Sequence, residues 1–303
     1  MSVCCGIDLG GTKIEGVLIE KNKTGFRVIE RLRVPTEKEK GYTHILSQIK
    51  KVVQLLETRG NLKITALGIG TPGSLDPKTQ TLKNSNTVCL IGKPIKKDLE
   101  NLLGISIEIA NDANCFALAE ATLGVVPKMA PHAKNVFGVI MGTGVGGGVV
   151  INGKILNGRN GIGGEWGHNY LEENGDDCYC GQSGCVETVI SGTALELHYQ
   201  RLSGTKRKLK EIYTLYQNQQ DEYAEATIER MLDFFGKGIS AIINTLDPDV
   251  IVIGGGVGNI DLLYTEGVQR AEKYAFNKTI ETMFLKPELG DSAGVFGAAM
   301  LVQ

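Results

Sequence analysis

The stretch CCGIDLGGTKIEGVLIE, residues 4–20, predicts a β-strand, a tight glycine turn and a second β-strand. Apolar residues, many of them β-branched, lie on both sides of the turn, and glycine permits backbone conformations that other residues avoid. The same plan recurs in NVFGVIMGTGVGGGVVINGKIL, residues 135–156. Because helical and strand patterns mix after each of these units, the chain is predicted to be an α/β protein built from two similar halves.

Helical periodicity and chain breaks suggest how these halves are organised. Apolar residues at helical spacing predict a helix over residues 42–60, with Gly60 as its C-cap. One domain is expected at residues 1–123 and the second at 124–290, since two prolines interrupt the chain near this boundary. A closing helix at about residues 291–303 is expected to return to the first domain.

Composition excludes several classes of protein. The 303 residues are 42% hydrophobic and 22% charged, with a net charge of −2, so a nucleic-acid partner is not indicated. The sequence shows no signal peptide and no apolar run that could cross a membrane. A cytoplasmic protein is expected, in which clustered cysteines hold a metal more often than they form disulfides.

The glycine-rich run GTGVGGG, residues 142–148, matches a dinucleotide-binding fingerprint. That fingerprint requires a helix after its last glycine, whereas VVINGKIL is β-branched and contains a turn, so a dinucleotide site is rejected. A glycine hairpin remains, whose backbone N–H groups could bind phosphate oxygens. A bare tight hairpin is the alternative, but it would need only a glycine or two. The residues assigned here to phosphate binding are Gly142, Thr143, Gly144, Gly146 and Gly147.

The turn DLGGTK offers complementary chemistry. Asp8 ends a strand and could hold a hydrated Mg²⁺, while Gly10 and Gly11 turn the chain. Thr12 and Lys13 add a hydroxyl and an ammonium group for phosphate oxygens. The motif is weak alone, because Gly-Gly turns between strands are common. Two such turns, each opening one half of the chain, indicate a nucleotide triphosphate more strongly.

The segment IANDANC places Asn111 and Asp112 where a strand meets a helix. One interpretation makes Asp112 the helix N-cap, which is worth about 1 kcal/mol. The other makes Asp112 a general base that accepts the proton of a substrate hydroxyl attacking phosphorus. With two phosphate-type turns elsewhere in the chain, the general base is the favoured hypothesis.

Three of the seven cysteines fall within eight residues, just after a histidine. His168, Cys178, Cys180 and Cys185 offer the ligands of a closed tetrahedral Zn²⁺ site in the loop 168–185. Reduced thiols without a metal, or a redox pair, are the alternatives. A metal would fix the polar side chains that flank the cysteines, and such a rigid set suits a polyhydroxylated ligand. His168 could use one ring nitrogen for zinc and the other for that ligand.

These residues resemble the ROK family of bacterial sugar kinases, repressors and uncharacterised open reading frames over nearly the whole chain. The matching motifs are DLGGTK (8–13), GIGTPGSLDP (68–77), NDANC (111–115), GTGVGGG (142–148), GEWGH (164–168), CYCGQSGCVE (178–187) and DPDVIVIGGG (247–256). The resemblance implies an actin-like, hexokinase-type fold with two α/β domains flanking a cleft, and a dimer or larger assembly.

The resemblance also implies roles for single residues. Asp112 would be the catalytic base. Sugar contacts would come from Gly73, Asn111, Asp112, Glu165, His168 and Glu187. The adenosine would face Gly254, Gly255 and Gly256. ATP with Mg²⁺, a hexose and structural Zn²⁺ would then be the ligands.

Within the family, several segments look most like the fructokinase/mannokinase branch, among them TPGSLDPKTQTLKNSNT and ISGTALELHYQRLSG. The expected reaction is therefore ATP-dependent phosphorylation of the 6-hydroxyl of fructose, with mannose and glucose as further substrates. N-acetylglucosamine kinase and glucokinase are the alternatives. Repressors of the family carry an N-terminal helix-turn-helix, for which this chain is expected to have no room. A sugar-sensing protein without catalysis is a more distant alternative, since it would need neither Asp112 nor the phosphate turns.

Overall fold

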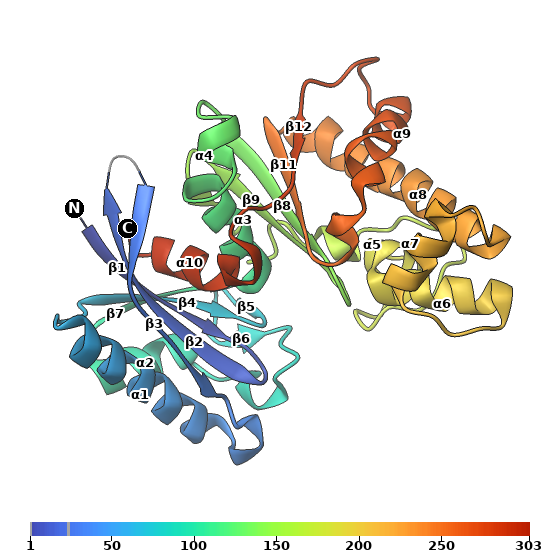
Figure 1. Cartoon of the computed structure of the whole chain (residues 1–303). Coiled ribbons are helices and arrows are strands. Elements are labelled where there is room, and N and C mark those ends of the chain that lie inside the picture. The colour runs from blue at the N-terminus through green and yellow to red at the C-terminus, as the bar shows by residue number, and fades with distance from the viewer. Residues whose placement is uncertain (1, 23–24) are drawn as a thin grey trace. The chain divides into compact units, whose positions relative to one another are not determined.

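The computed structural model describes residues 2–22 and 25–303, and its chain forms two compact units. Unit 1 comprises Met1–Met129, Gly148–Gly163 and Glu288–Gln303. Unit 2 comprises Ala130–Gly147 and Gly164–Pro287. Figure 1 shows strands and helices mixed in both, as predicted for an α/β protein.

Unit 1 is built on a five-stranded sheet of order β3-β2-β1-β4-β7. Its strands are β1 (Ser2–Leu9), β2 (Lys13–Asn22), β3 (Gly25–Pro35), β4 (Ala66–Thr71) and β7 (Ser106–Asn111). β1 pairs antiparallel with β2 and parallel with β4, so the predicted strand, glycine turn and strand of residues 4–20 are confirmed. A short hairpin joins β5 (Ser74–Leu75) to β6 (Leu82–Lys83).

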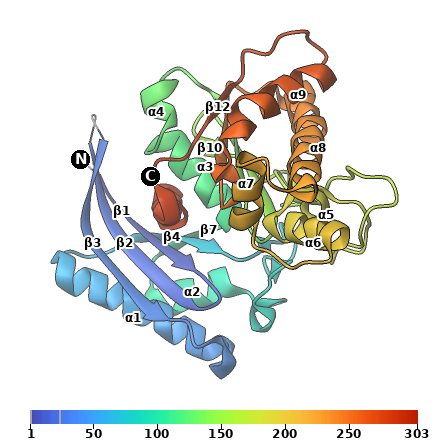
Figure 2. The same cartoon turned by 45° about the vertical axis from the view of Figure 1, so that its right-hand side comes forward.

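Helices cover both faces of this sheet (Figure 2). They are α1 (Tyr42–Gly60), α2 (Ile95–Leu103), α3 (Asp112–Thr122) and α10 (Ala293–Met300), while the short helix α4 (Val126–Met129) packs on α3. Gly16 faces α1, where a Cβ would lie 3.0 Å from Leu56 Cδ1. Gly6 faces the other side, where a Cβ would lie only 2.8 Å from Ala299 Cα of α10. The missing side chain at Gly6 therefore lets α10 pack directly on the strand backbone.

The second sheet has the order β10-β9-β8-β11-β12. Its strands are β8 (Asn135–Met141), β9 (Val145–Ile151), β10 (Lys154–Ile155), β11 (Val250–Gly254) and β12 (Met283–Leu285). The glycine run continues into strand β9 and not into a helix, which agrees with the prediction that it is not a dinucleotide site. The helices of unit 2 are α5 (Val186–Ile190), α6 (Gly192–Ser203), α7 (Leu209–Gln217), α8 (Glu222–Leu246) and α9 (Glu266–Tyr274).

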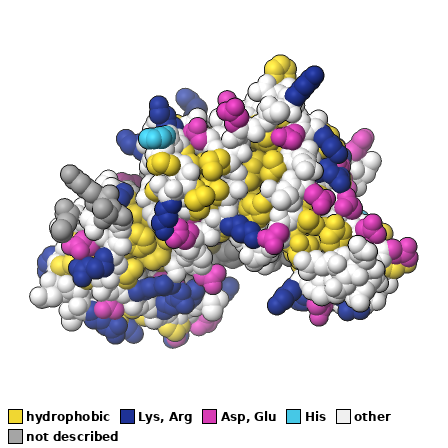
Figure 3. Space-filling view, turned by 45° about the horizontal axis from the view of Figure 1, so that its top comes forward, with side chains coloured by type: hydrophobic (Ala, Val, Ile, Leu, Met, Phe, Trp, Pro, Cys, Tyr) yellow, Lys and Arg dark blue, Asp and Glu magenta, His cyan; other side chains and the backbone are white. Residues whose placement is uncertain are grey.

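One predicted helix boundary is wrong by a residue. Gly60 is the last residue of α1, and the C-cap is Asn61, whose φ of 49° is left-handed. Asparagine tolerates this conformation better than most residues with a side chain, so a glycine is not required there. Among the residues that the model describes, no helix is long and apolar enough to cross a membrane. Acidic and basic side chains are interspersed on the face drawn in Figure 3.

Candidate active site

The turn after β1 is closed by its own backbone. The amide of Gly10 donates to the carbonyl oxygen of Lys13 over 3.0 Å. Thr36, which follows β3, donates its amide to Thr12 O (2.9 Å) and its hydroxyl to Gly10 O (2.7 Å). The predicted phosphate turn is therefore fixed at both of its ends by hydrogen bonds.

Asp8 lies half-buried at the start of this turn. Burial raises the pKa of its carboxyl group to about 6, and the nearby carboxylates of Asp112 and Glu15 add to the shift. Lys13 and Arg33 act in the opposite direction. A divalent cation would favour the ionised carboxylate, so the donor chemistry at Asp8 fits the hydrated Mg²⁺ that accompanies a nucleotide.

Glu15 is a buried carboxylate beside this turn that no sequence motif indicates. Glu15 is only 1% exposed and forms ion pairs with Arg31, with Arg33 at 2.8 Å and with Lys13 at 3.7 Å. Three cations around one carboxylate leave a positive surplus next to the turn, which suits a polyanionic ligand. Alternation along the strands could have indicated this cluster, because Glu15 pairs with Arg33 across β2 and β3.

The junction of β7 and α3 separates the two interpretations of Asp112. Asn111 is the N-cap, since its Oδ1 accepts a hydrogen bond from the Asn114 amide at 2.7 Å. Asp112 is the first helical residue, and its Oδ1 accepts only from the Ala113 amide at 2.8 Å among the hydrogen bonds described. The N-cap interpretation of Asp112 is therefore wrong.

The Asp112 carboxylate remains accessible to solvent, although protein surrounds it closely enough to remove much of the bulk water. This desolvation raises the pKa of Asp112 above its ordinary value, against the lowering effect of the Ala113 amide. Gly73, a predicted sugar contact, has a packing reason for its identity. A Cβ there would lie 2.6 Å from the carbonyl oxygen of Lys83.

In unit 2 the glycine hairpin between β8 and β9 is attached to the start of α5. The amide of Gly142 donates to Gly144 O at 2.9 Å and closes the hairpin. Oε2 of Glu187 accepts a hydrogen bond from the Val145 amide at 2.8 Å. A Cβ on Gly144 would lie 3.1 Å from Cδ of Glu187 and closer still to Oε2. Glu187, which is predicted to bind the sugar, thus lies against the hairpin predicted to bind the nucleotide. The sequence does not indicate this contact.

The three glycines predicted to face adenosine lie at the end of β11. Gly254 is the last residue of that strand, and Gly255 has a left-handed φ of 82°. A Cβ on Gly255 would lie 2.9 Å from the backbone nitrogen of Met141, at the end of β8. Because β8 and β11 are parallel, these glycines and the hairpin lie at the same edge of the sheet.

The predicted metal donors converge. One donor atom from each of His168, Cys178, Cys180 and Cys185 lies within 4.8 Å of the others. The Sγ atoms of Cys180 and Cys185 are 3.6 Å apart, and Cys178 Sγ is 3.5 Å from His168 Nδ1. Zn–S bonds of about 2.3 Å in a tetrahedron place donors about 3.8 Å apart, so this set fits Zn²⁺. The sulfur separation is too long for a disulfide.

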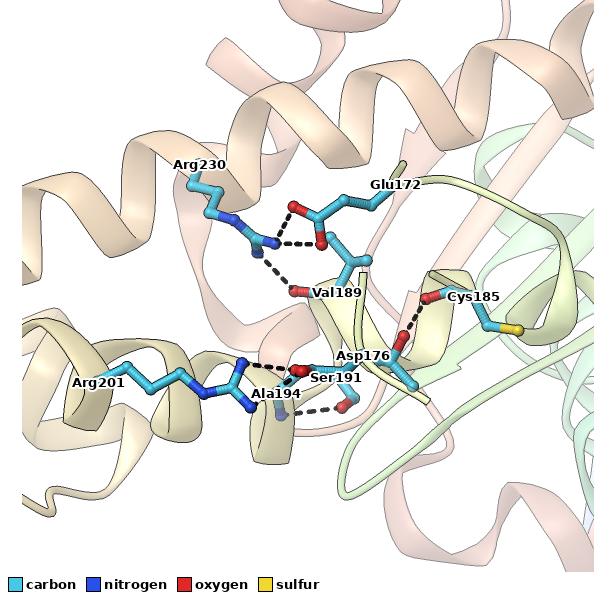
Figure 4. A network of polar contacts seen from close by, with 9 residues as sticks. Glu172, Asp176, Cys185, Val189, Ser191, Ala194, Arg201 and Arg230 are labelled. Atoms are coloured by element: carbon cyan, nitrogen blue, oxygen red, sulfur yellow. Dashed lines mark hydrogen bonds and ion pairs between the residues drawn. The ribbon is translucent and has the colours of Figure 1, made fainter. Parts of the chain in front are cut away.

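Two arginines hold the same loop from outside the donor set (Figure 4). Arg230 of α8 donates to both carboxylate oxygens of Glu172, at 2.6 and 2.7 Å. Arg201 of α6 donates to both oxygens of Asp176, at 2.7 and 2.9 Å. The Arg230 pair is half-buried and contributes more to holding the loop than the exposed Arg201 pair.

The sequence and the fold were compared with those of known proteins. The ROK family model matches residues 4–303. The chain belongs to the ROK family. An N-acetyl-D-glucosamine kinase of Vibrio atlanticus (strain LGP32) is 38% identical over 310 residues, covering 98% of each chain.

Solved ROK structures share the fold. A ROK hexokinase from Thermus thermophilus superposes with a TM-score of 0.87 at 31% identity, covering 99% of this chain and 97% of the other. A ROK family glucokinase from Streptomyces griseus, in complex with glucose and AMPPNP, superposes with a TM-score of 0.76 at 26% identity, covering 99% of each chain. The predicted actin-like, hexokinase-type fold is therefore confirmed.

The relatives correct one expectation about the substrate. Several segments of this ROK protein resemble the fructokinase branch and predict fructose as the substrate. Its Vibrio atlanticus relative, however, is an N-acetyl-D-glucosamine kinase. Short segments outside the predicted sugar contacts report ancestry more than substrate, because sugars are distinguished by a few hydrogen bonds and by the shape of the site. N-acetylglucosamine, the alternative named from the sequence, is better supported than fructose.

Proposed function

We propose that this ROK-family protein, a sugar kinase that transfers phosphate from ATP, acts on the 6-hydroxyl of N-acetyl-D-glucosamine. The observation that carries the choice of sugar is the full-length similarity to an N-acetyl-D-glucosamine kinase, 38% identical over 98% of both chains. A domain shared at this level over its whole length supports a shared substrate more strongly than isolated motifs do.

Asp112 would accept the proton of the 6-hydroxyl as that oxygen attacks the γ-phosphorus and the bond to ADP breaks. Two features of the structure support this role. The carboxylate does not cap the helix, and desolvation raises its pKa, which strengthens it as a base. Asp8 would hold the hydrated Mg²⁺ that accompanies ATP and neutralises charge on the phosphoryl oxygens, and the Thr12 hydroxyl would bind a phosphate oxygen.

Glu165, His168 and Glu187 would bind sugar hydroxyls, together with Asn111 and the backbone at Gly73. The four donors His168, Cys178, Cys180 and Cys185 would hold a structural Zn²⁺ with no open position. Zinc at Nδ1 of His168 would leave Nε2 as a hydrogen-bond donor for the sugar. Rigid placement of these groups supports recognition by directed hydrogen bonds.

The proposal is tested by measuring ADP release with N-acetylglucosamine, glucose, mannose and fructose. We expect kcat/KM for N-acetylglucosamine to exceed that for each of the other three sugars by about tenfold or more. The reason is that buried polar groups of the enzyme would lose a hydrogen-bond partner when one of the other sugars binds. A higher kcat/KM for fructose would restore the substrate first expected from the sequence. Sugar binding without ADP release from any of the four would favour a sugar-sensing protein.

A further inference from the structure

Tyr179 contacts His168, one of the side chains proposed to bind the sugar, although the sequence presents it only as the residue between two cysteines. Its hydroxyl oxygen is 2.9 Å from Nε2 of His168. Its ring meets the imidazole edge-on, with centroids 5.0 Å apart and an interplanar angle of 89°. Tyr179 therefore contacts the His168 imidazole through both its hydroxyl and its ring.

The contact with His168 uses the nitrogen that the proposed function reserves for the sugar. Nδ1 of His168 belongs to the metal donors, since it lies 3.5 Å from Cys178 Sγ. When Nδ1 binds a metal, the ring carries its hydrogen on Nε2 and can donate one good hydrogen bond there. With a metal on Nδ1, the Tyr179 hydroxyl would accept that hydrogen bond, and a sugar hydroxyl bound at Nε2 would need the same hydrogen.

The Tyr179 side chain can also rotate away from His168. It is 79% exposed, so rotation of its side chain uncovers little apolar surface and its hydroxyl can exchange His168 for water. The backbone around it is fixed separately, because the Cys178 amide donates to Gln182 O at 2.7 Å and the Gly181 amide to Cys178 O at 3.0 Å. Movement of the ring does not require movement of the loop.

We propose that Tyr179 is a displaceable placeholder that occupies the sugar's hydrogen-bond position on His168 and thereby weakens sugar binding. The proposal rests on the proposed function, since it takes His168 as a sugar ligand. A binding sugar breaks the bond between Tyr179 and His168 and forms its own. Tyr179 is thus a specificity-determining residue, because only a sugar that also satisfies Glu165 and Glu187 gains enough to displace it.

The test is isothermal titration calorimetry of N-acetylglucosamine into wild-type protein and Tyr179→Phe. The variant keeps the ring and removes the competing hydroxyl, so we expect its Kd for the sugar to fall by about two- to tenfold. The KM for the sugar should fall by the same factor while kcat and the KM for ATP stay unchanged. An unchanged Kd, or a weaker one, would overturn the proposal, since a weaker Kd means that the hydroxyl contacts the sugar directly.

Two controls keep the result specific. Tyr170→Phe changes another exposed tyrosine of the same segment, 69% exposed, and should leave the Kd at the wild-type value. The zinc content of Tyr179→Phe should equal that of the wild type, and a loss of zinc would assign the hydroxyl to holding the loop and overturn the proposal. If wild-type protein phosphorylates another hexose instead, the proposed substrate fails, and the same comparison with that hexose still tests Tyr179.

Discussion

Gly144→Ala places a methyl group between the proposed nucleotide hairpin and Glu187, which is proposed to bind the sugar. The new Cβ would lie 3.1 Å from Glu187 Cδ and closer still to Oε2, so the carboxylate must withdraw. Carbon atoms in ordinary contact are about 3.5–4.0 Å apart, which sets the withdrawal at roughly 1 Å. That movement breaks the 2.8 Å hydrogen bond from the Val145 amide.

A hydrogen bond to a charged acceptor contributes about 1.5–3 kcal/mol, and a sugar hydroxyl bound by a displaced carboxylate loses a similar amount. We therefore expect the Kd for N-acetylglucosamine to rise by roughly 10- to 100-fold, because each 1.4 kcal/mol is a factor of ten. The substitution falls in the nucleotide turn, yet its main effect should be on sugar binding. Nucleotide affinity without sugar should change less than about threefold.

Isothermal titration calorimetry with each ligand alone measures both effects. Gly142→Ala is the matched control, because a Cβ at Gly142 meets nothing within 4 Å among the described residues. Its sugar affinity should stay within about twofold of the wild type. A folded Gly144→Ala variant that binds the sugar as tightly as the wild type would refute the link between Glu187 and the hairpin.

Three further predictions concern the groups around the two turns. Because the pKa of Asp8 is raised to about 6, its carboxylate is ionised above that pH and protonated below it, so the KM for MgATP should rise as pH falls below 6; a KM that stays flat from pH 7.5 to 5 would contradict this. Metal analysis should find about one zinc ion per chain, and chelation should weaken sugar binding while nucleotide binding is retained; an active, zinc-free preparation would contradict the structural role. Glu15→Gln should lower the free energy of unfolding in urea by about 1.5–3 kcal/mol, since Lys13, Arg31 and Arg33 lose their shared counter-ion; an unchanged midpoint would count against it.

Local patterns were enough to predict most of the fold. Residues 4–20 and 135–156 form strands around a glycine turn because short-range periodicity and turn chemistry decide those segments. The sequence does not distinguish Gly60 from Asn61 as the C-cap of α1, because both residue types tolerate a helix end and the exact terminal residue depends on the last hydrogen bond.

The candidate site was predictable where its parts lie close in sequence. His168 and the three cysteines fall within one loop, and the structure brings them together. Contacts between distant segments were not predictable in this way. Glu187 accepts a hydrogen bond from the amide of Val145, which lies 42 residues earlier in the sequence, and no sequence pattern predicts that contact. Nothing in the sequence indicates a contact for Tyr179, because a single residue between two cysteines shows no periodicity of its own.

The assignment of Asp112 as the base that deprotonates the 6-hydroxyl is the centre of this account. Single-turnover phosphoryl transfer to N-acetylglucosamine, measured for wild type and Asp112→Asn, tests it most directly. The variant should bind both substrates with near wild-type Kd values and transfer phosphate about 10²- to 10⁴-fold more slowly, which is the usual contribution of a general base. Transfer at the wild-type rate by the variant would contradict the mechanism proposed here.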